Sequence, residues 1–338
     1  MITWQSFQRK GIDRFNAERL MMILAVITLL VLSMMLTAVK LTFSVHIMGA
    51  VGFLEMLLAI YIVDRIPSSE SLHRFLLRIN LVIALVFAVL SRTSYAYSHI
   101  IIDSLNLGYA NPNATAIYLL MNVSLLLVYS FRIQKRLHKW ALFALCAYLV
   151  YLIYETDSRT CLIAVAVIGI YTFTSPKWRI PNWLFPVVLL IPLAFLFVYS
   201  SLYQTGRYMD LMILGKPFYS GRESYFVQML GDLKGYWLIG DVGQHPFSNM
   251  HNGPLTILSG CGVLGYLIYL LYIHGTLRQY YRGEVSRIQT VALMVIFAAF
   301  IHSGSEAALL TGGANYSITM ATFYWLLKGS GSNHASEI

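Results

Sequence analysis

Charged side chains are scarce in this sequence: only 12% of its 338 residues are Asp, Glu, Lys or Arg. Soluble domains carry about 25% charged residues, so this chain has too little polar surface to cover a soluble fold. No internal repeat is detectable, and no soluble module interrupts the sequence. Since 58% of the residues are hydrophobic, we expect a single integral membrane domain over residues 1–328.

Cysteine is also rare, with three residues in the whole chain. Cys146, Cys161 and Cys261 lie within or at the edge of apolar runs and show no paired spacing. This argues against a disulfide framework and favours packing roles for all three. No cluster of His and Cys has the spacing of metal ligands, so we expect no metal and no other cofactor.

Long apolar runs make up most of the sequence. A helix needs about 20 apolar residues to cross a bilayer, and ten runs approach that length. The sequence therefore predicts an all-α integral membrane protein with ten transmembrane helices. The expected spans are 20–39, 41–63, 75–91, 112–131, 139–154, 160–174, 183–203, 253–275, 288–304 and 306–327.

Lys and Arg are distributed unequally between the gaps that separate these runs. One set of gaps holds 17 of the 24 and the other set holds 7. Cytoplasmic loops keep the larger share, so both termini are predicted to be cytoplasmic, with a disordered tail at residues 329–338. Residues 204–252 then form one large extracytoplasmic loop. The net charge of +9 is spread over short cytoplasmic loops, which indicates orientation signals and not nucleic-acid binding.

The large loop has a sequence pattern of its own. The segment SGRE at residues 220–223 has the form of a capping box at a helix start. Apolar residues then recur at helical spacing, which predicts an amphipathic helix lying on the outer membrane surface. These apolar residues are Tyr225, Phe226, Met229, Leu230, Leu233 and Trp237.

Three helices that start on the outer side have polar first turns: GYANPNATA before the fourth span, TDSRTCL before the sixth and HNGPLTIL before the eighth. Helix N-termini carry partial positive charge and free N–H groups, so they favour anions. The residues suited to the first turn are Pro112 and Pro254, and those suited to capping are Asn111, Ser158 and Asn252 or Gly253.

Cations accompany these helix starts on the predicted outer face. If the N-termini converge with Arg159, Arg207 and Arg222, they form an anion site suited to a phosphate or a diphosphate. Capping alone explains any single one of these motifs. Three motifs together with three arginines favour a site. The remaining candidates for substrate binding there are Asn111, Asn113, Asn252 and Glu306.

Four segments in this order resemble one known family: GYANPNATA, TDSRTCLIAVAV, a long outer loop with SGRESYFVQML and LIGDVG, and MHNGPLTILSGCGVLGYLIYL. They are similar to the O-antigen polymerase and O-antigen ligase superfamily. The resemblance covers residues 105–275, about half of the chain, and their order and spacing matter more than any one segment.

The resemblance implies an integral-membrane glycosyltransferase of the bacterial cytoplasmic (inner) membrane, active on its outer side. The donor glycan would be carried on undecaprenyl diphosphate, and a second lipid-linked glycan would be the acceptor. A flippase and a chain-length regulator would be further partners. By motif, the family's essential residues correspond to Arg159, Arg222 and His251, and we add Arg207 from its charge and position.

Chemistry supports these assignments independently of the family. Breaking a sugar–diphosphate bond releases an anion, which arginine stabilises without losing its charge; Arg159 and Arg222 are our candidates. The attacking sugar hydroxyl is a poor nucleophile, so a general base such as His251 would help by taking its proton. Direct displacement with inversion needs no metal and no covalent enzyme intermediate.

Simpler interpretations exist for two of these residues. His251 lies just before the start of a helix, where an imidazole can simply form a hydrogen bond with a neighbouring carbonyl. Glu306 ends the segment SGSE, residues 303–306, which reads as a second capping box, and Glu306 is also a candidate alternative base.

Two other functions are compatible with the sequence. A ligase of the same superfamily would transfer finished glycan to a different acceptor, which donor-site chemistry does not distinguish from polymerisation. A transporter of lipid-linked sugars would concentrate polar residues near the membrane midplane, often in repeated halves. Because the polar residues gather at the outer edge, we favour an enzyme, and among enzymes a polymerase of O-antigen, capsular or exopolysaccharide repeat units, since polymerases vary widely in sequence and length.

Overall fold

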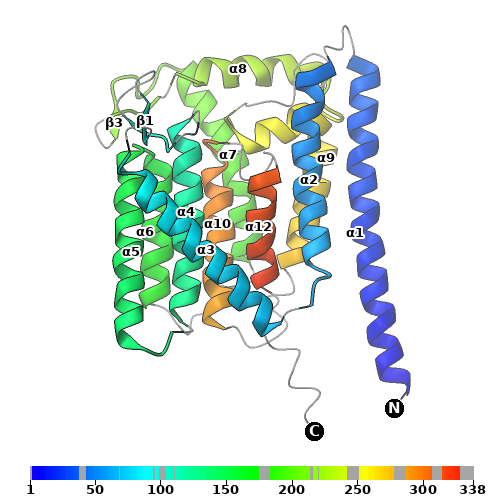
Figure 1. Ribbon diagram of the computed structural model, residues 1–338. Coiled ribbons are helices and arrows are strands. Elements are labelled where there is room, and N and C mark those ends of the chain that lie inside the picture. The colour runs from blue at the N-terminus through cyan, green and yellow to red at the C-terminus, as the bar shows by residue number, and fades with distance from the viewer. Residues whose placement is uncertain are drawn as a thin grey trace. The chain divides into compact units, whose positions relative to one another are not determined.

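The computed structural model of the protein is predominantly helical (Figure 1). It divides into two compact units, one made of Met1–Val63, Phe185–Arg278 and Ser303–Ala321, the other of Asp64–Leu184, Gln279–His302 and Thr322–Ile338. The expected single domain stays a prediction. The predicted tail at 329–338 lies outside the described residues, which are 2–37, 43–67, 69–93, 96–98, 104–107, 109, 111–131, 133–174, 181, 183–213, 216–219, 221–241, 251–277, 286–306 and 314–327.

Long helices account for most of these residues, and short elements lie between them. The long helices are α1 (Ile2–Thr37), α2 (Phe43–Val63), α3 (Glu70–Leu90), α4 (Pro112–Ser130), α5 (Arg136–Glu155), α6 (Arg159–Thr174), α7 (Leu184–Gln204), α9 (Gly253–Leu277), α10 (Arg287–His302) and α12 (Ala314–Leu326). The short elements are the strands β1 (Tyr97–Ser98), β2 (Ser104–Leu105), β3 (Met212–Ile213) and β4 (Lys216–Pro217), the helix α8 (Glu223–Asp232) and the 3₁₀ turn η2 (Leu233–Gly235).

Six of the described helices are long and apolar enough to cross a membrane: Ala17–Leu36 of α1, and α3, α4, α5, α7 and α9. Helices α6 and α10 and part of α2 are apolar but shorter. These helices confirm the all-α membrane class, while the number of ten spans stays a prediction. Glu306, the expected first residue of the last span, is not helical, residues 307–313 lie outside the described residues, and α12 begins at Ala314.

In the first unit, α1 packs against α9 and α2. A buried cation lies in this packing: Arg19 is only 1% exposed. Its guanidinium donates a hydrogen bond to the Thr276 hydroxyl and lies over the Tyr272 ring, 5.1 Å from the centroid. The Tyr272 hydroxyl donates in turn to the Leu57 carbonyl at 2.8 Å. One polar chain therefore joins α1, α9 and α2, in surroundings where unbonded polar groups are costly.

The second unit is built around α4, which contacts α3, α5, α6 and α10. Most side chains of α4 are buried, as expected for a helix that is apolar on all sides. Asn80 of α3 donates through Nδ2 to the Asn122 carbonyl of α4 at 3.1 Å. The strands β1 and β2 pair in antiparallel fashion, with Tyr97 opposite Leu105.

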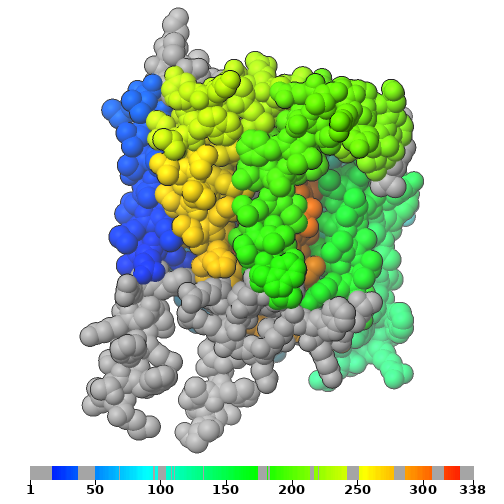
Figure 2. All heavy atoms as spheres, turned by 180° about the vertical axis from the view of Figure 1, so that it is seen from behind, coloured from blue at the N-terminus to red at the C-terminus, as the bar shows by residue number. Residues whose placement is uncertain are grey.

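The predicted outer loop belongs to the first unit and contains the expected helix. Helix α8 and the turn η2 bury Phe226, Met229 and Leu233, which confirms the helical spacing, and α8 contacts α9. In Figure 2 the loop residues cover the ends of α7 and α9. The antiparallel pair β3 and β4 was not predicted, because two-residue strands are too short to show an alternating pattern. The membrane-surface location of α8 stays a prediction.

Helix α9 is interrupted at Cys261 and Gly262, where the backbone leaves the helical conformation. Such an interruption deprives N–H and C=O groups of partners within the helix, which is costly in apolar surroundings. Residues 237–241 of the loop supply the missing partners. The carbonyls of Trp237 and Leu238 accept from the N–H groups of Val263 and Leu264 at 2.8 and 3.3 Å, and the Asp241 N–H donates to the Ser259 carbonyl at 2.7 Å.

Two glycines allow the loop and the broken helix to approach backbone to backbone. Gly262 has φ +64°, and a Cβ there would lie 2.3 Å from the Leu238 carbonyl. Gly240 has φ +80°, and a Cβ there would lie 2.4 Å from the Ser259 oxygen. Any side chain at either position would separate the two segments and adopt a strained backbone.

Replacing Gly262 by Ala should therefore destabilise the protein by about 2–3 kcal/mol, through the clash and the positive φ. The thermal unfolding temperature in detergent can be followed with a thiol-reactive dye, because Cys146, Cys161 and Cys261 are all buried. Gly169→Ala in α6 is the matched control, since a Cβ there meets nothing within 4 Å and Ala favours a helix. Equal unfolding temperatures for the two variants would contradict this account of the break.

Candidate functional site

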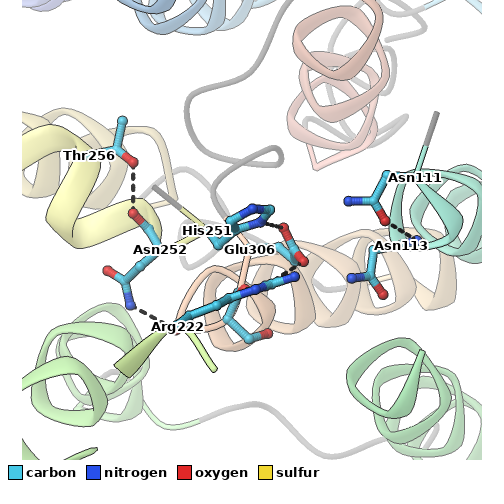
Figure 3. Close-up of polar contacts among 9 residues, drawn as sticks. Asn111, Asn113, Arg222, His251, Asn252, Thr256 and Glu306 are labelled. Atoms are coloured by element: carbon cyan, nitrogen blue, oxygen red, sulfur yellow. Dashed lines mark hydrogen bonds and ion pairs between the residues drawn. The ribbon is translucent and has the colours of Figure 1, made fainter. Parts of the chain in front are cut away.

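Three of the predicted site residues meet in the first unit. The carboxylate of Glu306 lies between the guanidinium of Arg222 and the imidazole of His251 (Figure 3). Arg222 Nη1 is 2.8 Å from Glu306 Oε1, and His251 Nδ1 is 2.9 Å from Glu306 Oε2. We call these three residues the Arg–His–Glu cluster. It joins the start of α8, the residue two positions before α9 and the turn after α10.

Glu306 is the buried member of the cluster, with 7% of its surface exposed. Burial by itself raises the pKa of this carboxyl. The hydrogen bond with His251 and the charge of Arg222 act in the opposite direction and hold the pKa of Glu306 below its ordinary value. The carboxylate is therefore ionised near neutral pH and serves two partners. The capping-box interpretation of residues 303–306 did not predict the contacts of Glu306 with Arg222 and His251.

The turn that carries Glu306 is fastened to the start of α9. Asn252 is fully buried and donates through Nδ2 to the Gly304 carbonyl at 2.7 Å. Its Oδ1 accepts from the Leu255 N–H at 2.8 Å, which confirms Asn252 as the N-cap of α9. The Gly253 N–H donates to the Ser303 carbonyl at 2.7 Å. Asn252 thus fixes the position of the turn that carries Glu306 relative to His251. The predicted contact of Asn252 with substrate stays a prediction.

His251 is held in an uncommon backbone conformation, with φ +48°. A positive φ at a residue other than Gly is disfavoured and often accompanies a functional constraint. Its Nδ1 is the nitrogen bonded to Glu306. When Nδ1–H donates to the carboxylate, the imidazole is oriented with Nε2 as its proton acceptor, as in other carboxylate–histidine pairs.

Arg222 contributes only one side of its guanidinium to the cluster. Its Nη1 donates to Glu306 and to the Ser305 carbonyl, at 2.8 and 3.1 Å. The edge formed by Nε and Nη2 makes no hydrogen bond with the described part of the chain. The side chain is 30% exposed, so this edge can bind a carboxylate or phosphate with two parallel hydrogen bonds.

Arg207 lies in the same unit but outside the cluster. It is exposed, its carbonyl accepts from the Tyr219 hydroxyl at 2.7 Å, and no ion pair with the cluster is present among the described residues. Its predicted role in substrate binding therefore has no support from these contacts.

The other predicted residues, Arg159, Asn111 and Asn113, belong to the second unit. Asn111 is the N-cap of α4, because its Oδ1 accepts from the Asn113 N–H at 2.9 Å, and Pro112 occupies the first turn as predicted. Arg159 is the first residue of α6 and is partly buried. The convergence of these residues with the Arg–His–Glu cluster stays a prediction.

The capping prediction fails for Ser158. Its carbonyl accepts from the Leu162 N–H at 3.1 Å, but its buried hydroxyl has no hydrogen-bond partner among the described residues. The turn before it is instead shaped by Asp157, which has φ +61°.

Within the described ranges, no group of three or more His, Cys, Asp or Glu side chains could hold a metal ion. Two of the cluster's three members are cations or cation-capable, and its single carboxylate is already shared between them. The cluster is therefore suited to binding an anion.

Fold and site together describe a helical membrane protein with an ionised cluster at the ends of its helices. Comparison with known proteins finds no matching family model, no similar curated protein and no similar solved structure. The family resemblance consequently depends on the four sequence segments alone.

The lowered pKa of Glu306 predicts a pH-dependent stability. The ionised carboxylate stabilises the folded protein above its ordinary pKa of 4.5, and this contribution is lost as the pH falls through the lowered pKa. Glu306→Gln should therefore unfold at a lower temperature than the wild type near neutral pH, and the difference should shrink below about pH 4.

Thermal unfolding across this pH range in detergent checks the prediction. Asp232→Asn provides the comparison, because Asp232 is an exposed carboxylate of the same loop and lies outside the cluster. If the difference in unfolding temperature between Glu306→Gln and the wild type stayed constant down to acid pH, the partners would not lower the pKa of Glu306.

Proposed function

We propose that this protein is a membrane glycosyltransferase that polymerises oligosaccharide repeat units carried on undecaprenyl diphosphate. The observation that carries the proposal is the Arg–His–Glu cluster, in which one buried carboxylate holds an arginine and a histidine together. The Nε–Nη2 edge of the cation makes no hydrogen bond with the described residues and the imidazole has a second nitrogen, so the pair can serve a leaving anion and an attacking hydroxyl. The product would be O-antigen, capsular or exopolysaccharide.

On the donor side, Arg222 would bind the diphosphate through Nε and Nη2. Negative charge grows on the diphosphate oxygen as the bond to the anomeric carbon breaks, so this contact is stronger in the transition state than in the bound substrate. Glu306 would keep Nη1 in place, and the guanidinium would not need to reorganise. In the proposal Arg159 supplies a second cation for the leaving diphosphate.

On the acceptor side, His251 would act as general base. A sugar hydroxyl attacks the anomeric carbon, its proton moves to Nε2, and the bond electrons leave with the diphosphate oxygen. Glu306 stabilises the resulting imidazolium through Nδ1–H, as carboxylates do in other carboxylate–histidine pairs. The step balances without a metal or a covalent intermediate, and the anomeric carbon is inverted.

The proposal also includes the finer topology: ten transmembrane helices, both termini in the cytoplasm, and the loop at 204–252 on the outer side of the bacterial cytoplasmic membrane. The distribution of Lys and Arg supports this orientation. In this orientation the cluster would lie at the outer face, where a glycan already carried across the membrane would be found.

Replacing His251 by Ala should leave expression intact and lower the rate of polymer growth by about 10²–10⁴-fold, because the general base is lost. The measurement is glycan length, in cells and with purified protein supplied with lipid-linked repeat units. His274→Ala is the matched control, since His274 is exposed and lies near the other end of α9. Wild-type chain lengths in the His251 variant would remove this residue from the mechanism.

The same assay separates the competing functions. A polymerase deletion strain should lose all polymer and retain single repeat units, whereas a ligase deletion strain should retain full-length glycan on its lipid carrier. A transporter would not lengthen glycan in the purified reaction.

Topology can be tested with single introduced cysteines. Met212 of β3 is 56% exposed and Leu137 of α5 is 79% exposed, and the proposal puts them on opposite sides of the membrane. Met212→Cys should react with an impermeant maleimide in intact cells, and Leu137→Cys only after permeabilisation. The three native cysteines are buried, so the background should be low. Labelling in the reverse order would contradict the orientation.

A further inference from the structure

Glu223, the residue next to Arg222, is a buried carboxylate that the proposed reaction does not use. It is 1% exposed. Its Oε1 accepts from the Tyr199 hydroxyl at 2.5 Å, and its Oε2 accepts from the Gly221 N–H at 2.8 Å. A buried carboxylate is costly unless hydrogen bonds compensate it. Both oxygens of Glu223 have such bonds, so this side chain fixes the backbone on either side of Arg222.

Tyr199 links this carboxylate to the scaffold. It is 6% exposed and belongs to α7, and its hydroxyl is also within 3.1 Å of the Phe218 carbonyl as a donor. Its ring packs at 5.2 Å against Phe218 and at 5.3 Å against Tyr219. The loop before α8 is therefore held onto α7 by one hydroxyl and a set of aromatic contacts.

Two consecutive residues thus bind two different parts of the first unit. Glu223 binds Tyr199 of α7, while Arg222 binds Ser305 and Glu306 in the turn after α10. Arg222 itself is the N-cap of α8 with no side-chain capping bond, so its backbone position depends on its neighbours. Gly221 before it has φ +89°, and because glycine adopts many backbone conformations, other contacts must fix the backbone that leads to Arg222.

We infer that Glu223 and Tyr199 form a positioning pair that sets the base of the Arg222 side chain, so that its guanidinium meets Glu306 and presents its Nε–Nη2 edge to the diphosphate. This inference rests on the proposed function. The pair touches no reacting atom and acts only through Arg222. A displacement of a catalytic group by about 1 Å can lower a rate up to about 10²-fold. The contact between Arg222 and the diphosphate strengthens in the transition state, so its misplacement should lower kcat more than it changes KM.

A double-mutant cycle tests the inference. Glu223→Gln keeps the size of the side chain but replaces one acceptor oxygen by an amide, and Tyr199→Phe removes only the donating hydroxyl. With lipid-linked repeat units and purified full-length protein, each should lower kcat about 10-fold or more while KM changes less than about 2-fold. On an Arg222→Ala background neither change should lower the residual rate further, because a group that acts through Arg222 loses its effect with it.

Arginine modification gives a second readout that does not need activity. Phenylglyoxal labelling followed by peptide mass spectrometry should show Arg222 reacting several-fold faster in Glu223→Gln and Tyr199→Phe than in the wild type. Arg207, exposed in the same loop, is the internal reference and should react at an unchanged rate.

The outcomes separate the two claims. An unchanged labelling rate of Arg222, or losses that add to that of Arg222→Ala, would overturn the positioning role even if the wild type lengthens glycan. If the wild type does not lengthen glycan, the proposed function fails, and the labelling comparison alone then decides whether the pair positions Arg222.

Discussion

The ionised carboxylate of Glu306 can persist in its buried position only because two partners compensate its charge, and this requirement organises the rest of the site. The three members of the Arg–His–Glu cluster are far apart in the sequence and come from separate elements. Removing Arg222 or His251 would leave the buried charge of Glu306 less compensated, which is more costly than losing an exposed ion pair. The start of α8, the mouth of α9 and the turn after α10 must therefore keep their positions together.

Helix α9 connects this requirement to the fold. It starts at the cluster, where Asn252 fastens it to the turn of Glu306, and it breaks at Cys261 and Gly262. The loop that carries Arg222 continues into residues 237–241, which bond to that break. Residues 237–241 are thus held by backbone groups of α9 that apolar surroundings would otherwise leave unsatisfied. Helix α8 therefore depends on tertiary contacts of the loop and not on the intrinsic stability of a short helix.

Sequence alone predicted the features that depend on local pattern. The apolar runs, the helix in the loop and the caps at Asn111 and Asn252 are each encoded within a few residues. Features that depend on distant partners were not predictable in this way. The segment ending in Glu306 has the local form of a capping box, yet the carboxylate binds residues 55 and 84 positions away in sequence. The break in α9 contains no proline. The loop residues 237–241 that bond to it come earlier in the sequence, and no local pattern links them to the break.

The cluster also accounts for how one site could serve both halves of the proposed transfer. In the proposed transfer, the guanidinium would attract a diphosphate through its directed Nε–Nη2 edge. If the acceptor hydroxyl gave its proton to His251, the cluster would gain one positive charge at the moment when negative charge accumulates on the leaving group. Glu306 is already bonded to Arg222 and His251, so this change in charge would need no movement of side chains, which is the condition under which electrostatic stabilisation is most effective.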